Sequence, residues 1–160
     1  MNKLQGILPA IVTPTDPSGI FQLEPFERLL AFVYEQGVDG LYVCGQTGEG
    51  LQQSIMQRKL VAEAATRYSP TSKTVMVHVG AASTADAVDL ARHAESVGAH
   101  ALSALPPIGN YSFVEVKSYY QTLVKPRLYL SSSTTFQVSL PPSARPPRLW
   151  NCAPFQTWLD

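Results

Sequence analysis

The sequence predicts an α/β protein whose strands form a parallel sheet. Short apolar, β-branched segments alternate four times with longer segments whose apolar residues recur at the helical period. Strands that alternate with helices form parallel sheets, because each helix returns the chain to the start of the next strand. The alternation stops near Lys125. We therefore expect a domain at residues 1–125 and a different kind of segment at residues 126–160.

The first two strand–helix units occupy the N-terminal part of this domain. Residues 7–13 are apolar and β-branched and are expected to form a buried strand. Pro25 favours the start of a helix and Gly37 its end, and the apolar positions between them share one face: Phe26, Leu29, Leu30 and Val33. Residues 40–44 are the second expected strand. Ser54, with a glutamine three residues later, has the pattern of a capping box for the second helix.

Two further units follow. Residues 74–79 and 99–105 are the third and fourth expected strands, and Ser83 is the expected N-cap of the helix between them. Ser112 and Glu115 form another capping-box pattern before a fourth helix. Two architectures fit this order, a doubly wound open sheet and half of a (β/α)₈ (TIM) barrel. In the half-barrel, one residue of each strand is expected to point into the barrel interior: Ile11, Val43, Val77 and Leu102.

Composition and charge exclude several classes of function. The chain has 12 basic and 12 acidic residues and 45% apolar residues, which predicts a globular protein with no nucleic acid or membrane as its partner. No apolar run is long enough to span a membrane, and residues 1–6 do not resemble a signal peptide. Cys44 and Cys152 form neither a disulfide framework nor a metal-binding cluster. The expected location is the cytoplasm, with reduced thiols.

The chemical signal is a glycine-rich loop at residues 45–50, directly after the second expected strand. Its sequence is Gly-Gln-Thr-Gly-Glu-Gly. Glycines allow a sharp turn and a close approach to a ligand, and exposed amides with the Thr47 hydroxyl can hold a carboxylate or a phosphate. The same pattern also fits a tight turn without a ligand. Its glycine spacing does not match a dinucleotide-binding fingerprint.

Three other motifs give this loop a context: Leu-Pro-Ala-Ile-Val-Thr-Pro at residues 8–14, His-Val-Gly-Ala at residues 78–81, and Pro106 with Pro107. Together they resemble the N-acetylneuraminate lyase / dihydrodipicolinate synthase family of class I aldolases, with the neuraminate lyase branch the more similar. The resemblance implies a (β/α)₈ barrel that is homo-oligomeric, often a tetramer. It also implies that pyruvate forms a Schiff base with a lysine of the sixth strand, beside a proton-relaying tyrosine of the fifth, with its carboxylate on the glycine-rich loop.

The resemblance assigns substrate-binding residues but no catalytic residue. Thr47 matches the invariant threonine of the family loop, and Gln46 stands where the family has serine or threonine. Gly45, Gly48 and Glu49 complete the loop, and Glu49 is expected to shape it by accepting backbone hydrogen bonds. No cofactor and no metal are expected. The remaining candidates have structural interpretations: Tyr111 as a packed loop aromatic, His78 as a satisfied core histidine, Cys44 as a small core residue, and His93 and His100 as residues away from the strand ends.

The segment at residues 126–160 departs from the family. It has six prolines, five serines and no lysine, so the family's Schiff-base lysine is missing. If its serine codons are TCN, the codons of residues 131–138, read two nucleotides later, permit Val-Val-Tyr-Tyr-Ile-Pro-Gly, the expected fifth-strand motif. The codons of residues 150–158 permit a family-like helix in the same frame. We therefore expect this irregular segment to be out of frame, with the slip near residues 123–126.

These observations predict a fragment of an N-acetylneuraminate lyase-like enzyme. The parent reaction cleaves a sialic-acid-like substrate to pyruvate and an aldehyde sugar, and the fragment itself is expected to be inactive. A dihydrodipicolinate synthase-type condensation of pyruvate is the alternative within the family. A non-catalytic half-barrel that binds a small carboxylate or a partner chain is the alternative from another class. The expected partner is pyruvate or another 2-oxo acid. The open strand edges of the fragment also favour self-association.

Overall fold

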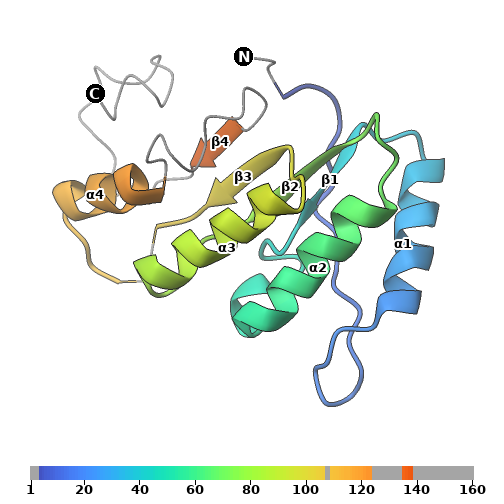
Figure 1. The fold of residues 1–160 in the computed structure, drawn as a ribbon, viewed down its shortest axis with the longest axis horizontal. Coiled ribbons are helices and arrows are strands. Elements are labelled where there is room, and N and C mark those ends of the chain that lie inside the picture. Colours follow the sequence, from blue (N-terminus) through green and yellow to red (C-terminus); the bar gives the residue numbers. More distant parts are fainter. Residues whose placement is uncertain (1–3, 107–108, 124–134, 139–160) are drawn as a thin grey trace.

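A computed structural model describes residues 4–106, 109–123 and 135–138 of the chain. Figure 1 shows strands alternating with helices from the N-terminus onward. The elements follow in the order α1 (Leu23–Glu35), β1 (Gly40–Val43), η1 (Gly50–Gln52), α2 (Ile55–Tyr68), β2 (Thr74–His78), α3 (Thr84–Ser96), β3 (Ala101–Ala104), α4 (Phe113–Leu123) and β4 (Thr135–Val138).

The strands form one sheet in the order β1-β2-β3-β4, and every neighbouring pair is parallel. Helices α1, α2, α3 and α4 pack side by side in chain order along the same side of this sheet (Figure 1). A doubly wound fold places helices on both faces of its sheet, whereas a (β/α)₈ barrel places them on the outer face alone. The half-barrel prediction is therefore confirmed.

The segment at residues 7–13 differs from the expected buried strand. It runs beside β1, where Ile11 N–H donates to Tyr42 O at 3.1 Å and Tyr42 N–H donates to Pro9 O at 2.9 Å. Only a single bridge between Ala10 and Tyr42 results. Pro9 has no N–H, which interrupts the ladder toward β1. Ile11 is buried, but Ile7 is 68% exposed, so the prediction of a buried strand is wrong.

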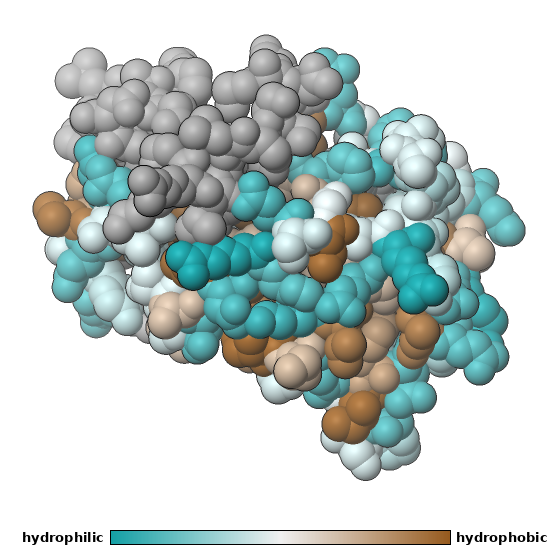
Figure 2. All heavy atoms as spheres, viewed as in Figure 1, coloured by the Kyte–Doolittle hydropathy of each residue, from teal (hydrophilic) through white to brown (hydrophobic). Residues whose placement is uncertain are grey.

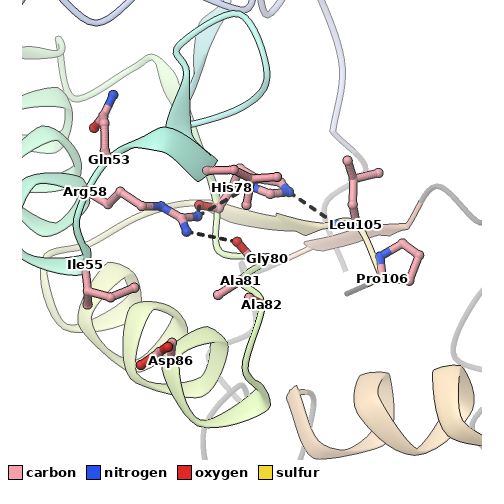
Figure 3. Close-up of a pocket in the computed structure, with 11 residues that line it drawn as sticks. Gln53, Ile55, Arg58, His78, Gly80, Ala81, Ala82, Asp86, Leu105 and Pro106 are labelled. Atoms are coloured by element: carbon pink, nitrogen blue, oxygen red, sulfur yellow. Dashed lines mark hydrogen bonds between the residues drawn. The ribbon is translucent and has the colours of Figure 1, made fainter. Parts of the chain in front are cut away.

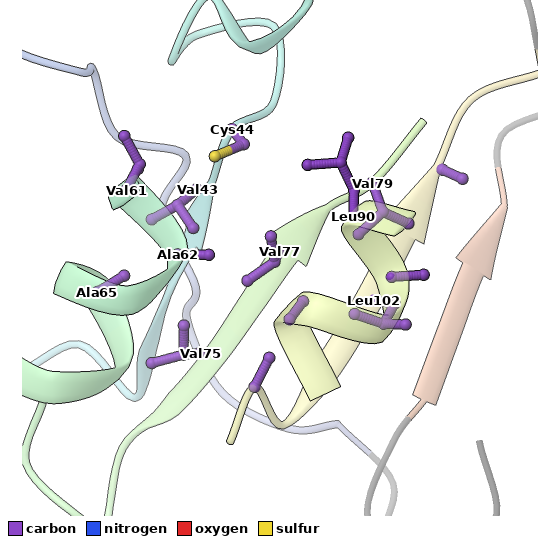
Figure 4. Close-up of a cluster of buried hydrophobic side chains, with 14 of the residues drawn as sticks. Val43, Cys44, Val61, Ala62, Ala65, Val75, Val77, Val79, Leu90 and Leu102 are labelled. Carbon is purple, nitrogen blue, oxygen red and sulfur yellow. The ribbon is translucent and has the colours of Figure 1, made fainter. Parts of the chain in front are cut away.

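The expected orientation of the strand side chains is also wrong. Val43, Val77 and Leu102 do not point away from the helices. They are buried in the core between the sheet and helices α2 and α3, with Val61 and Leu90 of those helices (Figure 4). In a parallel sheet both faces are covered, so apolar residues occur on both faces and do not identify the barrel interior. Side chains alternate between the two faces along a strand, so an error of one residue assigns each side chain to the wrong face of the sheet.

The predicted helix starts are largely confirmed. Ser54 accepts a hydrogen bond from Gln57 N–H, Ser83 accepts one from Asp86 N–H, and Ser112 exchanges hydrogen bonds with Glu115 as a capping box. The capping box at Ser54 is only half formed, because Gln57 Oε1 instead accepts from Phe21 N–H at 2.6 Å. This bond ties the loop before α1 to the start of α2.

The C-terminal segment was expected to be irregular, but four of its residues form β4. The register pairs Ala101 with Thr135 and Ala104 with Val138. Threonine, phenylalanine and valine favour strands, and β3 offers a free edge to pair with. The other residues of the segment, including Cys152, lie outside the described residues.

Figure 2 shows the helix-bearing side of the molecule, where hydrophobic side chains are scattered among hydrophilic ones. Exposed hydrophobic residues of α1 and α2 include Phe32, Met56 and Leu60. Within the described residues, no helix is both long and apolar enough to cross a membrane.

Candidate functional site

The glycine-rich loop after β1 has an unusual backbone. Cys44 and Glu49 have left-handed φ values of 58° and 53°, a region that residues with a Cβ rarely adopt. A Cβ at Gly50 would overlap the Cys44 carbonyl group, so only glycine fits there. At Gly48 a Cβ would lie 3.0 Å from Ile11 O. The two glycines therefore allow the loop to fold tightly over the end of β1.

Hydrogen bonds hold the loop in this shape. The Gly48 carbonyl accepts from Thr13 Oγ1 at 2.8 Å and from Gln53 Nε2 at 2.7 Å. Within the loop, Gly50 N–H donates to Gly45 O at 3.0 Å. Glu49 contributes its backbone: its N–H donates to Gln46 O, and its carboxylate accepts no hydrogen bond from the described residues. The expectation that the Glu49 side chain shapes the loop is therefore wrong.

The exposed tip of the loop opens onto a cavity of about 530 Å³. Gln46 and Thr47 line it from the loop, and Tyr42 and Ser103 line it from β1 and β3. The other lining residues are Leu4, Gly6, Leu8, Met76, His78 and Leu105. None of them is acidic or a lysine. The structure thus brings together the two substrate-binding residues predicted from the sequence, and it places them with polar groups of neighbouring strands.

Tyr42 and Ser103 are site residues that the sequence analysis did not identify. Their hydroxyl groups lie 3.2 Å apart across the sheet, and either can donate. Burial raises the pKa of the Tyr42 phenol, so this group stays protonated and available as a donor. The alternation of side chains along a strand could have identified them. Once Val43 is placed against the helices, its neighbour Tyr42 must face the cavity.

His78 ends β2 and connects the strand ends. It is 3% exposed, and its Nε2 accepts a hydrogen bond from Leu105 N–H at 3.2 Å. Burial, reinforced by the charge of Arg58, lowers the pKa of His78 to about 4, while a hydrogen bond to the Cys44 backbone opposes this effect. His78 is therefore neutral near pH 7. The interpretation as a satisfied core histidine is confirmed, although its ring also borders the cavity.

Arg58 of α2 fixes the end of β2 and was also missed. It is 2% exposed, and its guanidinium donates to Gly80 O at 2.9 Å and to His78 O at 2.7 Å (Figure 3). A second cavity of about 260 Å³ lies beside it, bordered by Gln53, Ile55 and Asp86 among others. In the sequence, Arg58 is one of two adjacent basic residues of the expected helix, Arg58 and Lys59, and nothing in this pattern indicates that Arg58 would be buried against strand carbonyls.

The other candidates have the structural roles expected of them, with one exception. His93 lies 3.1 Å from Glu63 on neighbouring helices, and His100 accepts from Val75 N–H at the start of the sheet. Cys44 is buried, and burial raises its pKa to about 11, which makes the thiol unreactive. Tyr111 is 38% exposed, so it is not the packed residue that was expected.

Comparisons with known proteins agree with this geometry. The profile of the dihydrodipicolinate synthetase family matches residues 3–131. The N-acetylneuraminate lyase of Mediterraneibacter gnavus is 37% identical over 108 residues, which cover 68% of this chain and 34% of that protein. The N-acetylneuraminate lyase of an Enterobacter species is 36% identical over 123 residues, with coverages of 76% and 41%. The chain thus spans less than half the length of these relatives.

Solved structures show the same similarity. CdNal from Clostridium difficile, in complex with mannosamine, superposes with a TM-score of 0.79 at 26% identity, covering 88% of this chain and 48% of that one. The N-acetylneuraminate lyase (sialic acid aldolase) of Aliivibrio salmonicida gives 0.77 at 31% identity, with coverages of 90% and 47%. The family profile covers most of the chain and the structures match its whole half-barrel, so the chain belongs to the dihydrodipicolinate synthetase family.

Proposed function

We propose that this chain forms the carboxylate-binding half of a pyruvate-dependent lyase of the N-acetylneuraminate lyase type. The parent reaction is the cleavage of a sialic-acid-like substrate to pyruvate and an aldehyde sugar. The names of the relatives support this reaction over a dihydrodipicolinate synthase-type condensation, which is the alternative within the family.

The observation that carries the proposal is the position of Gln46 and Thr47. Both side chains are exposed at the tip of a braced loop, and both line the cavity at the carboxyl ends of the strands. Active sites of (β/α)₈ barrels lie at this end. The Thr47 hydroxyl and the Gln46 amide can both donate to a carboxylate, and none of the described residues that line the cavity is acidic and would repel one.

The chain itself is proposed to be inactive because no lysine among the described residues lines this cavity. Lys73 precedes β2, at the opposite end of the strands from the loop, and its Nζ donates to Val38 O at 2.8 Å. Lys59 pairs with Asp89 between α2 and α3, on the outer layer. Schiff-base formation requires a lysine amine next to the substrate carbonyl, and none of the lysines that the structure describes, Lys59, Lys73 and Lys117, lines the cavity.

Binding without turnover is therefore the expected behaviour, and it is also what a non-catalytic half-barrel module would show. Pyruvate binding is measured by NMR titration of the chain. Thr47→Ala is expected to weaken it at least about tenfold, the effect of one lost charge-assisted hydrogen bond. Thr66→Ala on α2 is the matched control and should leave it unchanged, because Thr66 bonds only to its own helix. Equal affinities for Thr47→Ala and the unaltered chain would remove the loop from the site.

A second measurement separates binding from chemistry. The chain is incubated with pyruvate and borohydride and analysed by mass spectrometry. No lysine adduct is expected, and a stable pyruvate adduct on any lysine would refute the proposal that the chain is inactive.

We further propose that the chain works in the cytoplasm and self-associates. A buried free thiol at Cys44 is compatible with a reducing compartment. Self-association is expected from the open strand edges of a partial barrel.

A further inference from the structure

In the glycine-rich loop at residues 45–50, most carbonyl groups are bonded while several amide groups are free. The carbonyls of Gly45, Gln46 and Gly48 all accept hydrogen bonds. The backbone N–H groups of Gln46, Thr47 and Gly48, in contrast, donate to no described residue. Free N–H donors attract an anion, whereas a free carbonyl oxygen repels one. The orientation of the loop carbonyls therefore decides whether the loop favours a carboxylate.

The Gly48 carbonyl is the one of these three whose partners lie outside the loop. Thr13 Oγ1 donates to it at 2.8 Å and Gln53 Nε2 donates to it at 2.7 Å, so both lone pairs of the oxygen are engaged. Neither donor lines the cavity at the tip of the loop. The two side chains therefore hold the negative end of this carbonyl away from the cavity.

Both donors project from positions that the fold fixes. Thr13 lies in the N-terminal segment, which Ile11 N–H ties to β1 by a hydrogen bond of 3.1 Å. Gln53 is the C-cap of η1 and directly precedes Ser54, the N-cap of α2. A Cβ added at Gly48 would lie 3.1 Å from Thr13 Oγ1, so glycine leaves room for the hydroxyl to approach. The carbonyl is thus held from two sides by two separate segments of the chain.

The Gln53 side chain includes an atom that destabilises the fold. Its Oε1 is buried and has no hydrogen-bond partner among the described residues. A buried unpaired oxygen lowers stability, and an apolar side chain of similar length would avoid that loss. The reverse orientation of the amide would place Oε1 against the Gly48 carbonyl, so only the observed orientation forms the bond. The benefit of a glutamine at this position therefore lies in its bond to the loop.

We propose that Thr13 and Gln53 are positioning residues, which prepare the loop for an anion by turning the Gly48 carbonyl away from it. This inference rests on the proposed function, in which the loop holds the carboxylate of pyruvate. Without the two donors, the conformational freedom of glycine lets the peptide group between Gly48 and Glu49 rotate, so that its oxygen can face the cavity. A bound carboxylate then meets a partial negative charge, and its affinity falls.

The test is a double-mutant cycle on the full chain, with pyruvate binding measured by NMR titration. Thr13→Val and Gln53→Met each remove one donor and keep a side chain of similar size. Each single substitution is expected to weaken binding about threefold, and the pair at least about thirtyfold, because one remaining donor still holds the carbonyl. Thr13→Ser keeps the hydroxyl and should bind pyruvate like the unaltered chain. Thr66→Val and Gln36→Met are the matched controls, since these side chains donate only to carbonyls of α2 and α1, respectively.

The NMR chemical shift of the Gly48 carbonyl carbon is a second readout, which a general loss of stability does not change. Measured without ligand, it should move in Thr13→Val and Gln53→Met, most in the double variant, and stay unchanged in Thr13→Ser and the controls. Circular dichroism checks that each variant retains its helices.

Four results would overturn the positioning role. They are a folded double variant that binds pyruvate as tightly as the unaltered chain, equal losses of affinity in the controls, a Thr13→Ser variant that binds as weakly as Thr13→Val, and an unchanged Gly48 carbonyl shift. An unaltered chain that binds no pyruvate would instead refute the proposed function, and the ligand-free shift then decides whether Thr13 and Gln53 hold the carbonyl.

Discussion

Lowering the pH from 7 to 5 is expected to destabilise the fold through His78. In the folded chain both the burial of the ring and the nearby Arg58 charge oppose protonation. The Nε2 atom also accepts from Leu105 N–H, and a proton on Nε2 would break that bond. Acid therefore favours the unfolded chain, in which the imidazole is hydrated and binds a proton freely.

The magnitude follows from the two pKa values. The pKa of His78 is 6.5 in the absence of these effects and about 4 in the fold. Because the folded pKa is the lower one, the stabilising contribution is complete above pH 6.5 and is lost as the pH falls toward 4. One pKa unit corresponds to about 1.4 kcal/mol, so the full loss is about 3 kcal/mol, of which about 2 kcal/mol falls between pH 7 and pH 5.

Urea unfolding at pH 7, 6 and 5 measures this loss, with His78→Gln as the test variant. A glutamine can still accept from Leu105 N–H but does not titrate, so the variant should be less stable at pH 7 and lose less stability on acidification. His93→Gln is the control, because His93 is a half-buried histidine that pairs with Glu63 between helices α2 and α3, away from the strand end that holds His78. A His78→Gln variant with the same pH dependence as the unaltered chain would show that another group carries the acid sensitivity.

Three further predictions concern the buried Arg58 side chain, the glycine-rich loop and the reading frame after α4. Arg58→Met leaves the buried carbonyls of Gly80 and His78 without donors and should reduce the free energy of unfolding by about 2–5 kcal/mol in urea titrations; a loss below about 1 kcal/mol would contradict this. Gly50→Ala should be more destabilising than Gly37→Ala, and should abolish pyruvate binding, because only the first substitution forces a Cβ into a backbone carbonyl; equal effects would refute the steric argument. We also propose that the codons after α4 are out of frame, so resequencing should reveal an intact barrel continuation, and its absence downstream would disprove the frameshift.

Local features of this fold could be predicted from the sequence because they depend on neighbouring residues. Ser83 caps α3 through a bond to a residue three positions later, and Gly37 ends α1 with a φ of 78°. The loop at residues 45–50 was identified in the same way, by glycines that its tight backbone requires.

Features that depend on distant partners could not be predicted. Val43 and Tyr42 are neighbours in an apolar strand, and only the packing of α2 decides which of them faces the cavity. Arg58 has carbonyl partners from the end of β2, 20 or more residues away. The strand β4 formed because β3 offered an edge, although the surrounding sequence is rich in proline.

The distant contacts also explain why stability and ligand binding should change together in this chain. Cys44 has a left-handed backbone that costs about 1–2 kcal/mol for a residue with a Cβ. Around it, its thiol contacts the Arg58 carbonyl at 3.7 Å, His78 bonds to its backbone, and Gly50 packs on its carbonyl. Protonating His78 breaks the bond from Leu105 N–H that positions its ring, and Arg58→Met removes the donor to the His78 carbonyl. Either change lets the His78 ring shift away from the Cys44 backbone, so the strained residue can relax. Because Cys44 directly precedes the loop, relaxation there displaces Thr47. Pyruvate affinity should therefore fall under the same conditions that lower the free energy of unfolding.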